Sequence, residues 1–505
     1  MEDFNIEQFI QQSLGNAEEM GKAIHELMNG RMRELPKAES YIAALDPKKH
    51  DIMDTQLRPD KLINIDPDSP DYGSTRSIMT NQDGSVPEHH KLEKVARIAL
   101  AFQKLIVKRA VGITFGNPVK YKVSTENEQE DALYRAVMRV LKDNKEAPLN
   151  RKVARHLYGL TEVAERWYTV EGDTPHTNYS DNPTKMKVKV QVFSPMFGDT
   201  LYPYFDDKRD MTAFSRVFTK KDADGKLRTY METYTADTFY LWSADGDGRN
   251  TSTANGWNMC DGYPKVNPYG KIPVIYGYQE EPEYADVQSI IDRLEKLVSN
   301  FADTNDYHAS PKIVVKGHVN SFCKKGEAGA ILELDPDADA SYLAWTQAPE
   351  AVKTEYNTLK ELLHTLTQTP DISWESVKGL NVSGVALELM FMDAILKVKD
   401  KEEVWLDYLM RRCNLLKAIL AVVDVNTFGE AQTSLCIDPE IVPYIITDAQ
   451  TRANIELSLT GNKQLKSRKS AMISLGVENV DDEIKAIEEE ENEANMFEQN
   501  EPTFA

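Results

Sequence analysis

Several features that mark common protein classes are missing from this sequence of 505 residues. Its four cysteines, Cys260, Cys323, Cys413 and Cys436, lie far apart and match neither a disulfide framework nor zinc-ligand spacing. No stretch approaches the roughly 18 consecutive apolar residues of a membrane helix. The acidic N-terminus also lacks the pattern of a signal peptide. We therefore expect reduced thiols in a cytosolic setting, no zinc site and no membrane association.

Catalytic motifs are missing as well. There is no P-loop pattern, and His25-Glu26 is followed by Asn29 where a zinc protease needs a second histidine. Ser383 lacks the first glycine of a nucleophile elbow, so a turn or an N-cap is its favoured role. The run 245–248 (DGDG) lacks the later ligands of a calcium loop and predicts a turn. The sequence thus predicts no catalytic residue, no metal site and no cofactor.

Positive charge is scarce. Lys and Arg number 59 against 81 Asp and Glu, which gives a formal net charge of −22 and a pI near 5.0. A protein that grips nucleic acid through its phosphates normally carries a basic surface. Either no nucleic acid is involved, or nucleic acid must pass the protein without being held.

Helical periodicity dominates the first third of the chain. Residues 1–50 have apolar positions at helical spacing, whereas 55–90 has the composition of a loop. Residues 91–111 predict an amphipathic helix, followed by a break at 112–118, a strand at 119–123 and helices over about 128–167. The helix predicted at 91–111 carries a basic face, which is either a subunit contact or a solvated surface. Its residues are Lys94, Arg97, Lys104 and Lys108.

The middle and the end of the chain differ in character. Residues 184–278 alternate like strands, most strictly at 185–193. Two amphipathic helices, 284–308 and 351–367, then flank a short turn-rich insert that begins with a strand at 312–316. The stretch 385–423 contains no Pro or Gly and predicts a helix of about 55 Å. The acidic stretch 481–498 predicts a solvated helix or a frayed end.

Three blocks of sequence resemble the portal proteins of siphovirus-type tailed phages. The first is Asn267-Pro-Tyr-Gly-Lys-Ile-Pro-Val274 with 283–292 and 297–300. The second is Thr369-Pro-Asp-Ile-Ser373 with Asn381-Val-Ser-Gly-Val-Ala-Leu387. The third, weaker block comprises 112–121 and 457–490. The stretch 442–447 lacks an obvious counterpart, and 184–262 matches only in its strand character.

This resemblance implies a mainly helical α+β fold that assembles into a ring, usually of twelve subunits. The implied parts are a wing at 1–283, a first stem helix at 284–308, a clip at 309–350, a second stem helix at 351–368, a tunnel loop at 369–384, a long helix with a return to the wing at 385–461, and a crown with an acidic tail at 462–505.

The resemblance also implies partners and contact residues. A portal ring sits at one capsid vertex of the virion, is assembled in the bacterial cytoplasm, and meets capsid, scaffolding, terminase and head–tail adaptor proteins. Double-stranded DNA passes through its channel, and an acidic channel would keep that DNA mobile. Candidates for DNA contact in the tunnel loop are Ser376, Lys378, Asn381 and Ser383. Candidates for partner contact in the clip are Lys316, Lys324 and Lys325. Another connector ring protein, or a packaging enzyme such as a terminase subunit, is the alternative.

Overall fold

The computed structural model forms two compact units. The larger unit comprises residues 1–369 and 396–443, and the smaller comprises 370–395 and 444–505. The residues described are 5–71, 74–77, 86, 88–221, 224–245, 256–308, 313–316, 319–321, 333–334, 339–342, 348–371, 391–444, 449–461, 465–477 and 479–499.

The N-terminal part of the larger unit is a sheet covered by two helices. Helices α1 (Ile6–Ser13) and α2 (Ala17–Asn29) are preceded by the N-cap residues Asn5 and Asn16, whose side chains accept hydrogen bonds from backbone N–H groups of the first turn. They pack on an antiparallel sheet with Ile10, Leu27 and Trp242 in the shared core. The path of that sheet is β11 (Asn258–Met259), β10 (Thr238–Asp245), β9 (Leu227–Tyr234), β8 (Met211–Lys221) and β7 (Thr200–Phe205), and β12 (Lys265–Val266) also pairs with β10.

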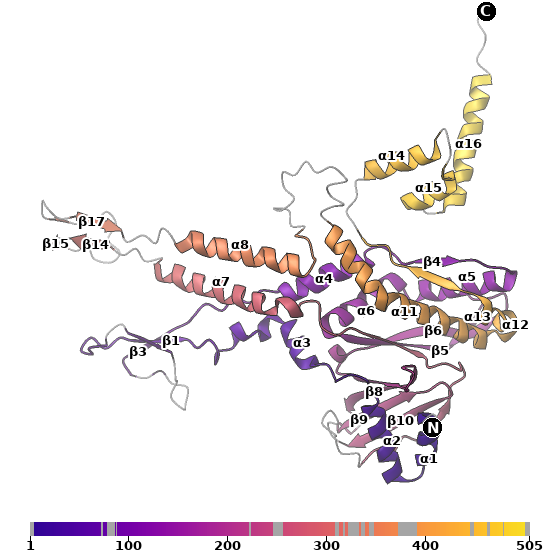
Figure 1. Cartoon of the computed structure of the whole chain (residues 1–505), viewed down its shortest axis with the longest axis horizontal. Coiled ribbons are helices and arrows are strands. Elements are labelled where there is room, and N and C mark those ends of the chain that lie inside the picture. Colours follow the sequence, from indigo (N-terminus) through magenta and orange to yellow (C-terminus); the bar gives the residue numbers. More distant parts are fainter. Residues whose placement is uncertain are drawn as a thin grey trace, which may run out of the picture. The chain divides into compact units, whose positions relative to one another are not determined.

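A second antiparallel sheet, in the order β13–β5–β6, forms the centre of the larger unit. Its strands are β13 (Val274–Tyr278), β5 (Glu162–His176) and β6 (Thr184–Phe193). Its core includes residues of the helices α4 (Phe102–Phe115), α5 (Glu128–Asp143), α6 (Glu146–Leu160) and α11 (Met392–Val423). Figure 1 shows α11 in orange alongside this layer. The strands predicted over 184–278 are therefore confirmed.

The last strand of the larger unit pairs with a strand from the first third of the chain. After α11 come α12 (Val425–Phe428), α13 (Ala431–Ser434) and β18 (Ile437–Glu440). Strand β18 pairs antiparallel with β4 (Lys120–Val123), the strand predicted at 119–123. The two strands lie more than 300 residues apart in the chain, so only the fold reveals this pairing.

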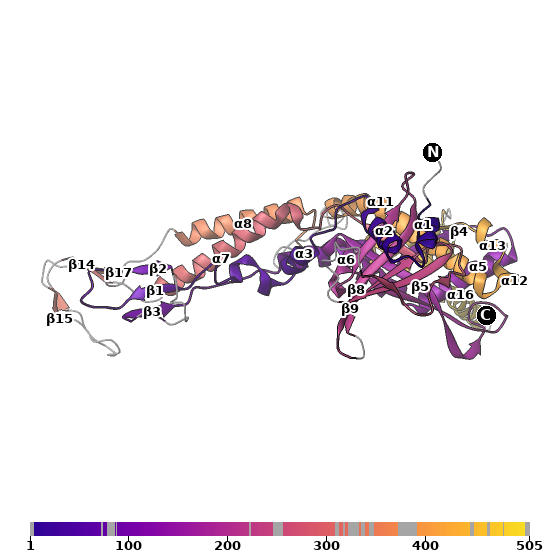
Figure 2. The same cartoon turned by 90° about the horizontal axis from the view of Figure 1, so that it is seen from below.

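Two helices form an arm that is called the stalk below. Helix α7 (Gln288–His308), preceded by η5 (Ala285–Val287), lies beside α8 (Ala348–Leu366) in Figures 1 and 2. The sequence between these two helices forms short antiparallel strand pairs, in agreement with the predicted helix–insert–helix order. These pairs are β14 (Ile313–Lys316) with β17 (Asp339–Tyr342) and β15 (Val319–Ser321) with β16 (Glu333–Leu334).

The smaller unit holds the C-terminal helices α14 (Ala449–Thr460), α15 (Arg468–Leu475) and α16 (Val480–Gln499). Glu456 joins the first two through Lys466 (2.8 Å) and Ser474 (2.7 Å), and Lys469 joins α15 to Asp481 at the start of α16. The predicted helix at 481–498 is confirmed.

The segment 55–90, predicted as a loop, contains strands. Strand β1 (Lys61–Asn64) pairs antiparallel with both β2 (Thr75–Ser77) and β3 (His90–Glu93). Turn residues such as Pro67 and Asp68 dominate the composition here and hide strands of three or four residues. The segment before β1 holds α3 (Ala38–Ala44) and two short 3₁₀ turns, η1 (Pro47–Lys49) and η2 (Asp51–Met53).

Two predicted helix boundaries are wrong. The helix expected over 91–111 exists only from Phe102, and it continues through Gly112 to Phe115. Residues 94–101, called the strap below, have no helical structure. The helices expected to reach about residue 167 end at Leu160, where Thr161 adopts a left-handed conformation (φ 70°) and β5 begins. Both errors arise where an apolar pattern continues smoothly from one element into the next.

Candidate functional site

The strap is fastened to α7 by a ladder of hydrogen bonds. Every second backbone N–H of the strap donates to a side chain of the helix, and the two segments run in opposite directions. The pairs are Ala96 with Asp303 Oδ1 (2.6 Å), Ile98 with Ser299 Oγ (3.0 Å) and Leu100 with Glu295 Oε1 (2.7 Å). The helical prediction failed here because the strap's N–H groups are satisfied by side chains about 200 residues away in sequence.

Elementary geometry explains the regularity of this ladder. Two residues of extended chain advance about 6.6 Å, and four residues of an α-helix rise about 6 Å. Acceptors spaced four apart on α7 therefore stay in step with donors spaced two apart on the strap. Glu295 lies on the polar side of the helix in the sequence pattern, yet it is buried (2% exposed) because the strap covers it.

Two arginines lock the strap to its surroundings. Arg58 donates to Asp303 Oδ2 (2.6 Å) and Asn300 Oδ1 (2.9 Å) on α7, and its Nε donates to the carbonyl oxygen of Ala96. Arg97 donates to Asp60 Oδ1 (2.7 Å) and to the carbonyl oxygen of Arg58. The strap is thus hydrogen-bonded both to α7 and to residues 58–60.

Glu295 has a second partner, His50, which is buried. The Nδ1 atom of His50 lies 2.6 Å from Glu295 Oε1, and its Nε2 atom lies 2.9 Å from the carbonyl oxygen of Ala44. The carboxylate of Glu295 therefore joins the segment after α3, the strap and α7.

The two stalk helices contact each other through both apolar and charged side chains. Leu363 of α8 is fully buried in the same core as Ile291 and Leu294 of α7. Arg293 of α7 also pairs with Glu355 of α8 (2.7 Å), and both of these side chains are partly exposed. The helix pair is therefore held by a buried apolar contact and by a partly exposed ion pair.

A buried carboxylate joins the base of the stalk to α11. Glu283, just before α7, forms ion pairs with Lys397 (2.5 Å) and Lys401 (2.8 Å), and Lys397 also donates to the carbonyl oxygen of Thr367 at the end of α8. Burial alone would raise the pKa of Glu283, but the two ammonium groups outweigh it and hold the pKa below its ordinary value. The start of α7 and the end of α8 therefore meet α11 at the same charged junction.

Helix α11 is in turn anchored in the core of the larger unit. Arg412 is fully buried and donates from Nε (2.6 Å) and Nη2 (2.8 Å) to the two carboxylate oxygens of Glu165 on β5, and from Nη1 to Asn150 on α6. Burial alone would lower the pKa of Arg412, but Glu165 holds it above its ordinary value. Two turns before Arg412, Trp405 donates to the hydroxyl of Tyr158 (2.9 Å).

The predicted contact residues divide into two groups. Ser376, Lys378, Asn381, Ser383, Lys324 and Lys325 lie outside the described residues. Lys316 is exposed in β14.

The predicted basic face is divided between two elements. Lys94 and Arg97 lie in the strap, whereas Lys104 and Lys108 are exposed on α4. These four residues therefore do not form one helical face, because the strap is extended, and Arg97 is engaged within the chain by Asp60. Sequence reasoning overlooked Glu283, Glu295 and Arg412, although the four-residue spacing of Glu295, Ser299 and Asp303 is visible in the sequence.

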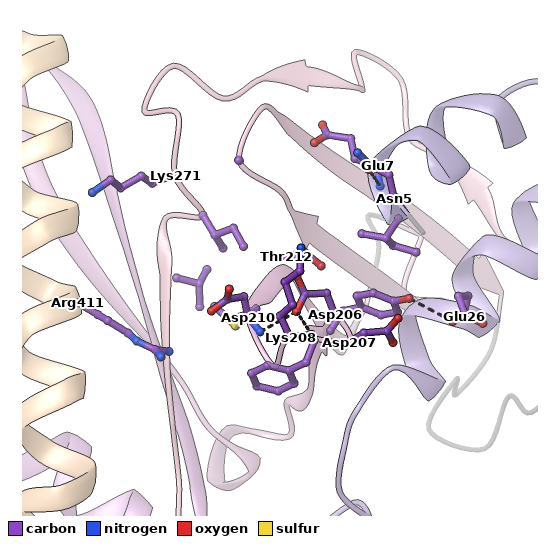
Figure 3. Close-up of a pocket in the computed structure, with 17 residues that line it drawn as sticks. Asn5, Glu7, Glu26, Asp206, Asp207, Lys208, Asp210, Thr212, Lys271 and Arg411 are labelled. Carbon is purple, nitrogen blue, oxygen red and sulfur yellow. Dashed lines mark hydrogen bonds between the residues drawn. The ribbon is translucent and has the colours of Figure 1, made fainter. Parts of the chain in front are cut away.

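A hollow of about 810 Å³ lies between the N-terminal sheet and α11. Figure 3 shows Lys271 and Arg411 on one side of it and Asp206, Asp207 and Glu26 on the other. The residues that line it include no His, Cys or Ser. Among the described residues there is also no group of three or more potential ligands that could hold a metal ion, and no helix long and apolar enough to cross a membrane.

Comparison with known proteins identifies the family. The family model described as "Phage portal protein, SPP1 Gp6-like" matches residues 31–496, which is most of the chain. The chain belongs to this family of phage portal proteins. It is thus a structural protein, and it forms a ring at a capsid vertex. No curated protein matches the chain.

Similar solved structures include three chains at 10% sequence identity, each matched over 74% of this chain. They are the "Neck of empty GTA particle computed with C6 symmetry" (TM-score 0.35, 89% of that chain), the "Neck of native GTA particle computed with C12 symmetry" (0.34, 88%) and the "Virion of native gene transfer agent (GTA) particle" (0.31, 88%). Likenesses of this size carry no conclusion about the chain.

Proposed function

We propose that twelve copies of this chain form the ring and that its channel conducts double-stranded DNA during packaging and ejection. Residues 284–308 and 351–368 are the stem, 309–350 the clip that docks the terminase and later the head–tail adaptor, and 369–384 the tunnel loop. Residues 1–283 supply most of the wing, 385–461 the long helix and its return, and 462–505 the crown. Capsid and scaffolding proteins are the further partners during assembly in the host cytoplasm.

The observation that carries this proposal is the helix pair α7–α8 with strand pairs between its two helices. Both helices return to one junction, where Glu283 and the carbonyl oxygen of Thr367 meet lysines of α11. A protein that binds the insert and pulls or pushes on it would transmit that force to α11 through this junction. Arg412 in turn connects α11 to the central sheet. Such a connection suits a passive mechanical part.

Electron microscopy of the purified full chain tests the assembly. We expect rings of about twelve subunits with an axial hole. A persistent monomer that hydrolyses ATP would instead support the packaging-enzyme alternative, and a ring that neither binds terminase nor admits DNA would support another connector protein.

Removal of residues 378–381 tests the tunnel loop. We expect the deletion variant to form rings but to package or retain less DNA in an assembly assay with terminase. Failure of the variant to form rings would show that this segment belongs to the subunit interface rather than to the channel.

A further inference from the structure

Strands β5 and β6 continue beyond the third strand of their sheet. Strand β13 pairs only with Glu162–Arg166, whereas the β5–β6 pairing extends to His176 and Thr184. One edge of β6 faces no other strand among the described residues. The far end of this sheet is therefore a two-stranded ribbon.

Three lysines stand at alternate positions of this ribbon. Lys185, Lys187 and Lys189 are exposed, whereas Val188 between them is buried against the core. Alternate residues of a strand point to the same face and lie about 6.8 Å apart. We call these three residues the lysine row.

The lysine row has no ion-pair partner among the described residues. Two carboxylates lie nearby. Asp143 lines the same hollow as Lys187 and Lys189 but is paired with Arg139 (2.9 Å), and Glu171 is opposite Met186, on the other face of the ribbon. Three unpaired cations in a line are unexpected in a chain with 81 acidic residues.

A hollow of about 500 Å³ lies beside the lysine row. Lys187 and Lys189 line it together with Asn178, Asn144 and the ion pair of Arg139 with Asp143. The Nδ2 atom of Asn144 donates to the carbonyl oxygen of Val188, which closes the free edge of β6 at that point. The surface therefore presents mainly hydrogen-bond donors and positive charge.

We propose that the lysine row, whose residues belong neither to the tunnel loop nor to the stem, binds the phosphate backbone of duplex DNA. This inference rests on the proposed function, which brings DNA to the ring. A regular line of cations suits a polymer with regularly spaced charges, and lysine side chains are frequent partners of phosphate oxygens. An acidic partner protein fits less well, because lysine is depleted from the cores of protein interfaces. The contact is independent of DNA sequence.

The proposal predicts how strongly DNA binding depends on salt concentration. Each neutralised phosphate contributes about 0.9 to the slope of log K against log salt concentration. Three contacts therefore contribute about 2.7 to that slope. In a chain of net charge −22, such binding is weak at physiological salt and measurable at low salt, so DNA stays free to move.

The test uses assembled rings of the full chain and a fluorescent duplex of about 30 base pairs over a salt series. The variant is K185Q/K187Q/K189Q, and the control is K220Q/K221Q/K265Q, which removes the same charge from exposed lysines of the N-terminal sheet. We expect the variant to bind at least about tenfold more weakly at 50 mM salt and to lose about 2.7 from the slope. The control should keep wild-type affinity.

Other outcomes would overturn the proposal. These are equal affinity of the variant and wild-type rings, or an equal loss of affinity in the control. Failure of the variant alone to form rings would assign the lysine row to the interface with a second copy. If the wild-type chain forms no ring, the proposed function fails instead, which is a separate result.

Discussion

The strap on α7 and the central part of α11 are held to the larger unit in opposite ways. Helix α11 is held by burial: Trp405, Leu409 and Leu416 are fully buried, and the charged side chain of Arg412 is equally inaccessible. The strap is held by a polar ladder in which Arg58 and Asp303 keep 15% and 20% of their side-chain surface exposed. Salt screens partly exposed charges more than buried ones, so we expect the second contact to depend more on salt than the first.

This difference separates a rigid part from one that can rearrange. Opening the centre of α11 would expose a large apolar area and an unpaired buried charge, which costs several kcal/mol. Releasing the strap replaces its hydrogen bonds to the protein with hydrogen bonds to water. This costs a free energy of about 1 kcal/mol for each neutral hydrogen bond and somewhat more for each charged one. If the stalk moves, we therefore expect the strap to be released while the centre of α11 keeps its position in the core.

The largest effect is expected from Arg412→Met. It leaves the carboxylate of Glu165 buried without its partner, so we expect a loss of about 3–5 kcal/mol in the free energy of unfolding. Urea denaturation followed by circular dichroism measures it. Arg411→Met is the matched control, because Arg411 is exposed and its ion-pair partner among the described residues is Asp407, one turn away; it should cost less than about 0.5 kcal/mol. Similar losses in both variants would refute the anchoring role.

Glu283→Gln should come next. Two lysines that are 11% and 22% exposed lose a charged acceptor, so we expect about 2–3 kcal/mol, less than for a fully buried pair. Protease cleavage near 283 and 367 should become faster in the variant. Glu280→Gln changes an exposed carboxylate nearby and should leave both measurements unchanged.

Acid should act on the same junction. Because the pKa of Glu283 is lowered in the folded chain, its contribution to stability is complete above its ordinary value of about 4.5 and is lost as the pH falls through the lower folded value. The stability difference between wild type and Glu283→Gln should therefore shrink below pH 4.5. A difference that stays constant down to pH 3 would contradict this account.

Asp303→Asn should weaken the strap alone, by about 1–2 kcal/mol. Hydrogen exchange at the Ala96 amide should accelerate accordingly, whereas exchange within α11 should not change. Asp306→Asn, on the exposed side of α7, is the control. Faster exchange throughout the larger unit would mean that the strap is part of the core.

Salt should produce the smallest effect. At 1 M the Debye length is about 3 Å, so the contact of Arg58 with Asp303 is partly screened and should lose a few tenths of a kcal/mol. The buried contact of Arg412 with Glu165 should be insensitive. Equal salt dependence of exchange in the strap and in α11 would remove the distinction between the two regions.

Local periodicity predicted the elements that are internally consistent. The strand at 185–193, the two stalk helices and the central part of the long helix at 385–423 each carry one pattern over enough residues to define them. The strap failed because Val95, Ala99 and Phe102 continue the apolar spacing of α4 while the backbone partners lie on α7. Short strands at 61–64 and 75–77 failed because three or four residues hold too little pattern.

Composition and short motifs were enough to indicate the portal family, the mixed fold and the helix–insert–helix order, because these depend on features local in sequence. The tertiary structure decided which polar groups matter. Glu295 belongs to the exposed side of a helix by periodicity and becomes buried when the strap covers it, and Arg412 becomes an anchor because Glu165 faces it across the core. Burial is a property of the partner segment as much as of the residue, and no local pattern contains it.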